Sequence, residues 1–221
     1  MRPLVSVIVP VHNQERYLGR CLRSLIAQDM PRHEYEIVVI DDGSTDRSAY
    51  ALELFADELQ IVSLPLNGGL PAAINVGLKQ ARADFVVRVD ADDYVNSRFL
   101  SVLHLFLESN SNLDAVACDY IFVDNGEMVL GRGNVDHEPI ACGIMFRLSQ
   151  LRELGLYDET FLAHEDLDLR HRFLQGHAIQ RIPLPLYRYR RHDANMTNDV
   201  EHLARFQKLL EEKHDLDGER T

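Results

Sequence analysis

Short, continuously apolar segments rich in β-branched residues recur along the first half of the chain, each followed by apolar residues at helical spacing. The four segments cover residues 4–11, 36–40, 61–64 and 84–89. A half-exposed strand would alternate apolar and polar residues, so we expect these strands to be buried on both faces. Buried strands that alternate with amphipathic helices indicate a parallel sheet covered by helices on both sides. The sequence therefore predicts an α/β fold of the Rossmann-like kind.

The second half of the chain has a looser pattern. Apolar runs occur at 115–123 and 140–146, and a helix is predicted at about 164–175. The segment 179–191 contains Pro183 and Pro185, so we expect an extended or edge segment rather than a central strand. Residues 199–221 carry apolar residues at helical spacing and predict an amphipathic helix and tail that packs on the domain or on a second chain. We expect residues 1–110 to form a nucleotide-binding half and residues 111–198 to complete its site.

Charge and cysteine content exclude several classes of partner. The chain has 35 acidic and 23 basic residues and a net charge of −12, which argues against binding nucleic acid or an anionic membrane surface. No window approaches the roughly 18 apolar residues of a transmembrane helix, and we expect no signal peptide. The three cysteines show no metal-type spacing, which is typical of a reduced chain. We therefore expect a cytoplasmic protein.

Polar residues follow three of the predicted strands where the strands end. The first strand ends in Pro10 and is followed by His12, the second leads into residues 41–46 (DDGSTD), and the fourth leads into residues 90–93 (DADD). In parallel sheets, ligands bind at this edge. The two acidic clusters would repel each other unless a cation or a polar ligand lies between them. For DDGSTD, helix capping is an equally good interpretation, because Ser, Thr and Asp are favoured N-caps.

The DADD segment gives the more specific indication. Three carboxylates directly after a buried strand suit Mg²⁺ or Mn²⁺, which bind through one or two carboxylates and substrate phosphates. The segment 67–75 (NGGLPAAIN) adds two glycines that let the backbone approach a ligand, and Pro71 suits the first turn of a helix whose amides face phosphate. Taken alone, this glycine-containing segment is also compatible with a plain turn.

Taken in order, five segments of the chain resemble the family 2 glycosyltransferases of the GT-A fold: VSVIVPVHNQERYL, EIVVIDDGSTD, NGGLPAAINVGL, DFVVRVDADDY and HEDLDLRHRF. The resemblance covers roughly residues 4–192. It implies a mostly parallel sheet flanked by helices with an elaborated acceptor-side region, an inverting reaction, a nucleotide-diphosphate sugar donor and Mn²⁺ or Mg²⁺ as cofactor. The implied nucleotide-binding residues are Pro10, His12, Asp42, Gly69 and Asp90, the implied metal ligand is Asp92, and the implied catalytic base is Asp166, with Glu165 as a supporting residue. Separately, the basic run 188–193 (RYRRHD), rare in so acidic a chain, suggests that Arg191 or His192 lies near a diphosphate, and a solvated surface is at least as good an interpretation for each.

Some positions depart from the commonest family pattern. His12 replaces a frequent Tyr, Ile74 a frequent Arg and His164 a usual Gly, while Leu167 and Arg170 occupy positions where Trp is common. These changes leave the predicted base in place and affect the expected acceptor pocket. HEDLDLRHRF also has a purely structural interpretation, because Asp166 with Arg170 and Asp168 with Arg172 are spaced as i, i+4 pairs that stabilise an exposed helix.

The expected reaction is transfer of a sugar from the nucleotide donor, with UDP as the family default, to a hydroxyl of a glycan or lipid-linked acceptor. Through such an acceptor the protein would lie at the inner face of the membrane. The sequence is compatible with a homodimer and does not decide the oligomeric state. One alternative is a noncatalytic nucleotide-sugar-binding protein. The other is an Asp-nucleophile phosphatase, but that motif usually ends the first strand and continues into Gly-Thr, whereas DADD follows the fourth strand and continues into Tyr94.

Overall fold

A computed structural model describes residues 2–193, 195 and 199–214. Its central feature is a parallel sheet of four strands in the order β3-β2-β1-β4. These strands are β1 (Val5–Val11), β2 (Tyr35–Asp42), β3 (Gln60–Leu64) and β4 (Phe85–Arg88). They match the four predicted segments to within one or two residues at each end. The prediction of a parallel α/β core is confirmed.

The second half of the chain extends this sheet from the β4 side. Strand β8 runs antiparallel between β4 and β6, and β9 runs parallel to β6 on its far side. The short β5 is the last strand of the sheet and pairs antiparallel with β9, and β7 pairs antiparallel with β6. The bounds are β5 (Tyr94–Val95), β6 (Ala115–Val123), β7 (Val129–Gly133), β8 (Ile144–Arg147) and β9 (Ile179–Arg190). Both halves of the chain therefore share one sheet.

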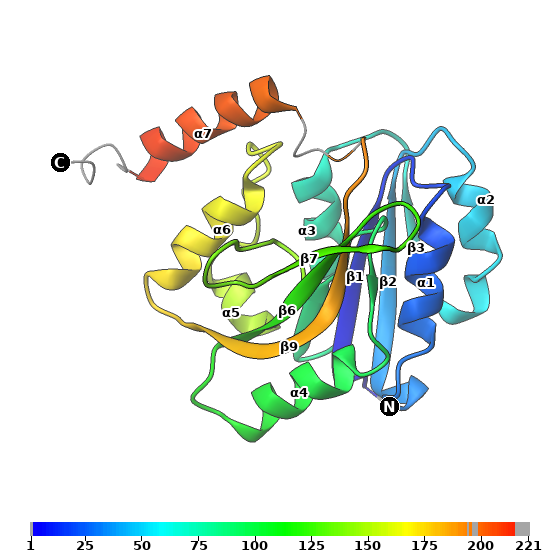
Figure 1. The fold of residues 1–221 in the computed structure, drawn as a ribbon, viewed down its shortest axis with the longest axis horizontal. Coiled ribbons are helices and arrows are strands. Elements are labelled where there is room, and N and C mark those ends of the chain that lie inside the picture. Colours follow the sequence, from blue (N-terminus) through cyan, green and yellow to red (C-terminus); the bar gives the residue numbers. More distant parts are fainter. Residues whose placement is uncertain (1, 194, 196–198, 215–221) are drawn as a thin grey trace.

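Helices cover both faces of the sheet (Figure 1). Helices α1, α2 and α4 contribute buried side chains to one apolar cluster, and α3, α5 and α6 contribute to the other. Along β1, Val7 and Val9 belong to the first cluster and Ile8 to the second, so the strand is buried on both faces as expected. The helices are α1 (Leu18–Ile26), α2 (Ser48–Glu53), α3 (Leu70–Gln80), α4 (Phe99–Ser109), α5 (Leu148–Glu153), α6 (Glu165–Leu174) and α7 (Val200–His214), with 3₁₀ turns at Arg32–Glu34 and Ala56–Glu58.

Strand β9 corrects one expectation. Its first part has β6 as a neighbour on one side, but Tyr187 and Arg188 also pair with β5, so the strand is not an edge along its whole length. The pairing register with β6 shifts around Asp119, where Pro183 and Pro185 occur. Proline lacks a backbone N–H and is tolerated at such irregular positions. The prolines thus indicated where the strand is irregular, and they did not exclude regular pairing further along.

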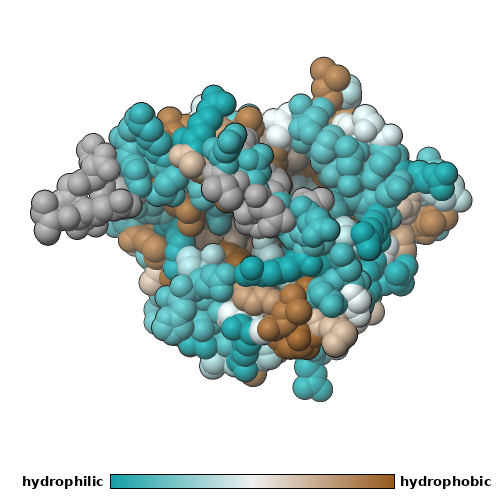
Figure 2. Space-filling model, turned by 45° about the horizontal axis from the view of Figure 1, so that its top comes forward, coloured by the Kyte–Doolittle hydropathy of each residue, from teal (hydrophilic) through white to brown (hydrophobic). Residues whose placement is uncertain are grey.

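Helix α7 packs beside the amino end of α6. Phe206 and Leu210 form a small apolar cluster with Phe161 and Ala163 of the segment that precedes α6. The predicted helix over 199–221 begins as expected and runs to His214, and residues 215–221 lie outside the described part. Among the described residues, none of the helices is long and apolar enough to span a bilayer. Figure 2 shows a largely hydrophilic face, with an apolar patch low in the view and smaller apolar spots elsewhere.

Candidate active site

The loops that follow β1 and β2 are joined by hydrogen bonds. The Asn13 side-chain carbonyl accepts a hydrogen bond from the Thr45 amide at 2.8 Å, and the Asn13 amide donates to Ser44 Oγ at 3.0 Å. His12 Nδ1 lies 2.8 Å from the Asp42 carbonyl oxygen, and the His12 residue is half-buried. Asn13 has a φ of 54°, in the left-handed region that Asn tolerates better than most residues. The structure therefore brings the predicted base-side residues of two strands together.

Asp42 fixes the glycine-containing loop before α3. Its two carboxylate oxygens accept hydrogen bonds from the Gly68 amide at 2.8 Å and the Gly69 amide at 3.0 Å. Gly69 has a φ of 91°, which favours glycine. Asp42 is thus not a helix cap, whereas Asp46 does bond the Ser48 amide at the start of α2. Of the residues that the capping interpretation concerned, Asp46 bonds the first amide of α2, whereas Ser44 accepts from the Asn13 amide instead.

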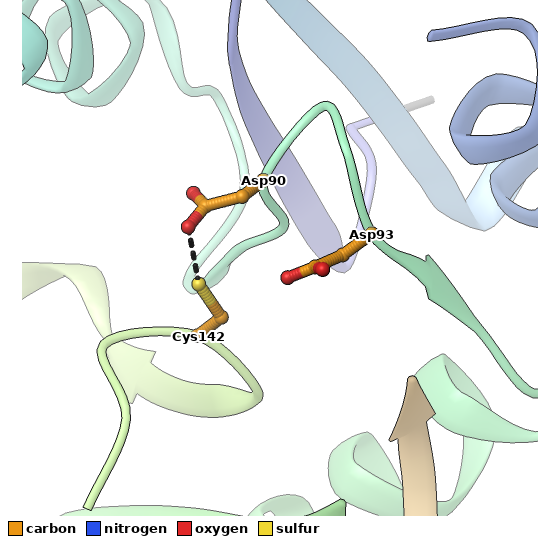
Figure 3. Close-up of side chains that lie close together, drawn as sticks. All are labelled: Asp90, Asp93 and Cys142. Atoms are coloured by element: carbon orange, nitrogen blue, oxygen red, sulfur yellow. Dashed lines mark hydrogen bonds between the residues drawn. The ribbon is translucent and has the colours of Figure 1, made fainter. Parts of the chain in front are cut away.

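Asp90 lies just beyond β4 and is held by two neighbours. Arg88 donates to both carboxylate oxygens, through Nε at 2.6 Å and Nη2 at 3.1 Å. The Cys142 thiol donates to Asp90 Oδ2 at 2.8 Å, and Figure 3 shows these two side chains facing each other from separate loops. Sequence reasoning placed Asp90 at the site but missed both partners.

Asp93 is buried and forms the third member of this cluster. It accepts hydrogen bonds from the Arg190 amide at 2.7 Å and the Tyr187 hydroxyl at 2.8 Å. One ligand-type atom each from Asp90, Asp93 and Cys142 lies within 4.8 Å of the others (Figure 3). Burial raises the pKa of the Cys142 thiol, and both carboxylates already have hydrogen-bond donors. The cluster is therefore a hydrogen-bonded support rather than a good site for a hard cation.

Asp92 and His192 form the arrangement best suited to a divalent cation. His192 Nε2 lies 2.9 Å from Asp92 Oδ2, although the residues are 100 positions apart in the sequence. Oxygen and imidazole donors suit Mn²⁺, and adjacent ligands of an octahedral ion with bonds of about 2.1 Å are about 3 Å apart. The His192 ring also stacks on Tyr17, with ring centroids 4.7 Å apart. The two residues fit a metal at the edge of the sheet where the resemblance implied one.

Arg88 links the strand-end carboxylates to helix α6. Its Nη1 donates to Glu165 Oε1 at 2.9 Å, and both side chains are more than nine-tenths buried. Glu165 is the first residue of α6, so the guanidinium joins Asp90 to the helix that carries Asp166. A charged residue within an otherwise apolar strand was visible in the sequence, and a buried charge requires a partner. That signal could have identified Arg88.

Asp166 lies in the first turn of α6 beside this network. Burial raises the pKa of its carboxyl group, and the positive charge of Arg88 offsets part of that increase. Hydrogen bonds from backbone amides of the first turn also favour the charged form. The ion pairs among the described residues include Asp168 with Arg172 at 2.7 Å but none between Asp166 and Arg170. The purely structural interpretation of HEDLDLRHRF thus applies to Asp168 and not to Asp166.

Arg191 and Arg190 of the basic run 188–193 both contact other groups of the protein. Arg191 pairs with Glu138 at 3.1 Å and lies over the Phe122 ring. Its buried neighbour Arg190, which the sequence analysis did not single out, donates to the Asp92 carbonyl oxygen at 2.9 Å. Arg190 therefore positions the backbone of the DADD segment. Pro10 is buried within β1, beside Ile40 of β2.

Comparison with known proteins identifies the family. A family model described as glycosyl transferase family 2 matches residues 6–168. The chain belongs to this family. A glycosyltransferase of Haemophilus influenzae is 36% identical over 176 residues, which cover 74% of this chain and 69% of that protein. The poly(ribitol-phosphate) β-N-acetylglucosaminyltransferase TarS of Staphylococcus aureus is 42% identical over 108 residues, 48% of this chain. The chain spans 19% of TarS, and 35% of the glycosyltransferase EpsJ of Bacillus subtilis.

Solved structures of family 2 and related transferases share the fold. The crystal structure of residues 1–349 of S. aureus TarS in complex with UDP-GlcNAc has a TM-score of 0.79 and 26% identity, covering 94% of this chain and 65% of that chain. The mannosyltransferase PcManGT of Pyrobaculum calidifontis, solved with GDP-Man and Mn²⁺, has a TM-score of 0.76. Its 21% identity supports likeness of fold alone. The GT-A architecture implied by the sequence resemblance is confirmed.

Proposed function

We propose that the protein is a metal-dependent inverting glycosyltransferase. It transfers a hexosyl or N-acetylhexosaminyl group from a nucleotide-diphosphate donor to a hydroxyl of a glycan or lipid-linked acceptor. Family membership supports a glycosyltransferase, and the TarS complexes with UDP-GlcNAc and UDP support a UDP-sugar donor.

The position of Asp166 is the main observation in support of the proposal. Its carboxyl group lies beside a buried ion-pair network, and burial raises its pKa. A base with a raised pKa accepts a proton more readily in the transition state. The acceptor hydroxyl oxygen attacks the anomeric carbon, its proton passes to Asp166, and the bond from that carbon to the diphosphate oxygen breaks. One direct displacement inverts the anomeric configuration and requires no covalent enzyme intermediate.

The donor is assigned to the loops beyond β1, β2 and β4. The half-buried His12 ring offers a face for the base, and the amides held by Asp42 shape the loop at the start of α3. Asp90, held in place by Arg88 and Cys142, is assigned to the ribose. A phosphatase would need the first Asp of DADD as a free nucleophile, so these two contacts favour the transferase.

Asp92 and His192 are the residues that would hold the metal. A divalent cation bound there supplies charge neutralisation for the departing diphosphate. Arg190 bonds the Asp92 carbonyl oxygen and therefore holds the Asp92 backbone in place. Asp93, bonded by the Arg190 amide and the Tyr187 hydroxyl, fixes the other side of the same turn.

The test of the proposal is Asp166→Asn. A base acts on the acceptor hydroxyl and does not hold the donor, so transfer should fall about 10²–10⁴-fold while donor affinity is kept. The measurement is single-turnover transfer with saturating donor and Mn²⁺, beside a donor titration by calorimetry and a thermal melt. The donor and acceptor are first selected by screening nucleotide sugars and glycans.

Asp168→Asn is a useful comparison, because Asp168 lies on the same helix as Asp166 and pairs with Arg172 of α6 and Lys213 of α7. That variant should lower the melting temperature more than Asp166→Asn does. Full transfer activity in Asp166→Asn would remove Asp166 as the base. Donor binding without turnover in the wild-type protein would instead support a noncatalytic nucleotide-sugar-binding protein.

A further inference from the structure

A small cavity lies beside Asp166, on the side of α6 that faces the sheet. Its volume is about 20 Å³, and its walls are mostly apolar, including Ile140, Phe146 and Leu169. The charged residues that line it are Asp166 and Arg170, one helical turn apart. A space of this size holds one water molecule or one oxygen atom of a ligand. The cavity therefore offers room for a single polar atom close to the predicted base.

Arg170 contributes an unpartnered donor to this cavity. Its Nη1 atom is buried and has no hydrogen-bond partner among the residues that the structure describes. Two other guanidinium groups near α6 are paired: the buried Arg88 with Asp90 and Glu165, and the partly buried Arg172 with Asp168. A buried donor without an acceptor costs free energy, and the cost is larger for a charged group. The position of Arg170 is therefore one that a ligand would stabilise.

The carboxylates around Arg170 do not supply that partner. Asp166 and Asp136 are the negative groups that act on it electrostatically. Asp136 pairs with Arg181 at 3.1 Å, and no ion pair joins Asp166 to Arg170 in the described part of the chain. Burial lowers the pKa of the Arg170 guanidinium, as expected for a cation without a close counter-ion. In a chain with a net charge of −12, an unpaired cation beside the base is unusual.

We propose that Arg170 binds an oxyanion of the acceptor, so that the acceptor is a phosphate-bearing or carboxylate-bearing sugar or polyol. This inference rests on the proposed function, because Asp166 must contact the acceptor hydroxyl for its neighbour to contact the same molecule. One turn of helix rises about 5.4 Å, so the anionic group and the attacking hydroxyl belong to the same or adjacent units of the acceptor. The donor diphosphate is assigned to the Asp92 and His192 edge and does not compete for Arg170.

The test compares Arg170→Gln with the wild-type enzyme on matched small acceptors. The pairs are glycerol 3-phosphate with glycerol, and glucuronate with glucose, so that the two pairs separate phosphate from carboxylate recognition. Arg205→Gln is the control, because Arg205 is exposed on α7. Binding is measured by calorimetry in the presence of UDP and Mn²⁺, and acceptor-dependent UDP release gives the acceptor KM.

The wild-type protein should bind one anionic probe at least tenfold more tightly than its neutral partner. Arg170→Gln should weaken that binding roughly 10–100-fold and leave binding of the neutral probe and of the donor unchanged. Equal binding of the anionic and neutral probes by the wild-type protein overturns the inference. So does an equal effect of Arg170→Gln on both members of a pair, which would mean that the cavity holds water. The binding readout needs no turnover, so it separates this inference from a failure of Asp166 as base.

Discussion

Two regions of the site satisfy their polar groups in different ways. One is the set of loops beyond β1, β2 and β4 to which we assign the donor (the donor loops), and the other is the amino end of α6. In the donor loops, Asp42 accepts two backbone amides, and Asn13 bonds the backbone of the neighbouring loop. At the amino end of α6, Glu165 pairs with one arginine from β4. Among the described residues, Asp166 has hydrogen bonds only from backbone amides, and the buried Nη1 atom of Arg170 has no partner. The first region is complete without a ligand, and the second is not.

This difference distinguishes a region with fixed geometry from the region to which we assign the chemical step. Backbone amides offer fixed geometry, so the donor loops are preorganised. Buried charges that depend on one partner, or on none, cost stability and are expected where a reaction needs them. Changes at α6 should therefore alter turnover and stability, whereas changes in the donor loops should alter affinity.

Among the variants that test this difference, Arg88→Met should have the largest effect. The change leaves Asp90 and Glu165 buried without their counter-ion, so the free energy of unfolding should fall by about 3–5 kcal/mol. Loss of the positive charge also raises the pKa of Asp166, so the acid limb of the transfer rate should move to higher pH. Chemical denaturation and a pH–rate profile measure the two effects.

Arg82→Met is the matched control for Arg88→Met. Arg82 pairs with the buried Glu36 at 2.7 Å, but its own side chain is 65% exposed. The control should cost about 1 kcal/mol or less and leave the pH profile unchanged. An equal loss of unfolding free energy in the two variants would mean that the Arg88 ion pairs stabilise the protein no more than the Arg82 pair does.

Asp92→Ala should have the next largest effect, on affinity rather than on stability. Changes to residues that only support metal ligands cost roughly 10–100-fold in metal affinity, so losing a ligand should cost at least about 100-fold in metal-dependent UDP binding. The fold should persist, because removing one of three clustered carboxylates also relieves repulsion. Calorimetry with UDP and Mn²⁺ checks this, with the exposed Asp57→Ala as control. Unchanged metal-dependent affinity would place the metal elsewhere.

His12→Ala tests the donor loops directly. Loss of a stacking contact should weaken UDP binding by roughly 1–3 kcal/mol and leave bare pyrophosphate binding unchanged. The His12 ring also bonds the Asp42 carbonyl oxygen, so a small loss of stability is expected as well. If UDP and pyrophosphate lose affinity equally, His12 does not contact the base.

The smallest effect concerns the attachment of α7. Burial opposes ionisation of Asp158, but hydrogen bonds from Lys213 and Thr160 outweigh it and lower the pKa of Asp158 to about 2. Because the unfolded pKa is about 3.9, this stabilisation is present above about pH 4 and is lost as the pH falls toward 2. Lys213→Met should cost about 1 kcal/mol or less near neutral pH and reduce the acid dependence.

Thermal melts between pH 2 and 7 check this prediction. The matched control is Lys208→Met on the same helix, whose side chain is 79% exposed and lies 3.7 Å from Glu212. The two variants should differ most above pH 4. Parallel melting curves for both variants across the whole range would show that Lys213 does not stabilise the ionised Asp158.

Local sequence was sufficient to predict the parallel core and the position of the loops. Apolar β-branched runs and strand-end polar residues are local features, and the structure places them at one edge of one sheet. The contacts that complete the site are not local. Arg88 meets Glu165 at a separation of 77 positions, and Cys142 meets Asp90 at 52. These pairs depend on β8 entering the sheet antiparallel beside β4, which no periodicity encodes.

The separation of Asp92 from His192 has a consequence for biosynthesis. At roughly 5–20 residues per second, the ribosome adds the 100 positions between them in about 5–20 s. The early βα units contain mostly short-range strand pairings and can form within that time, whereas β9 must emerge before it can pair with β6. A nascent chain thus carries a complete set of donor loops before it has the far side of its site. Stalled or truncated chains should bind a nucleoside weakly and transfer nothing.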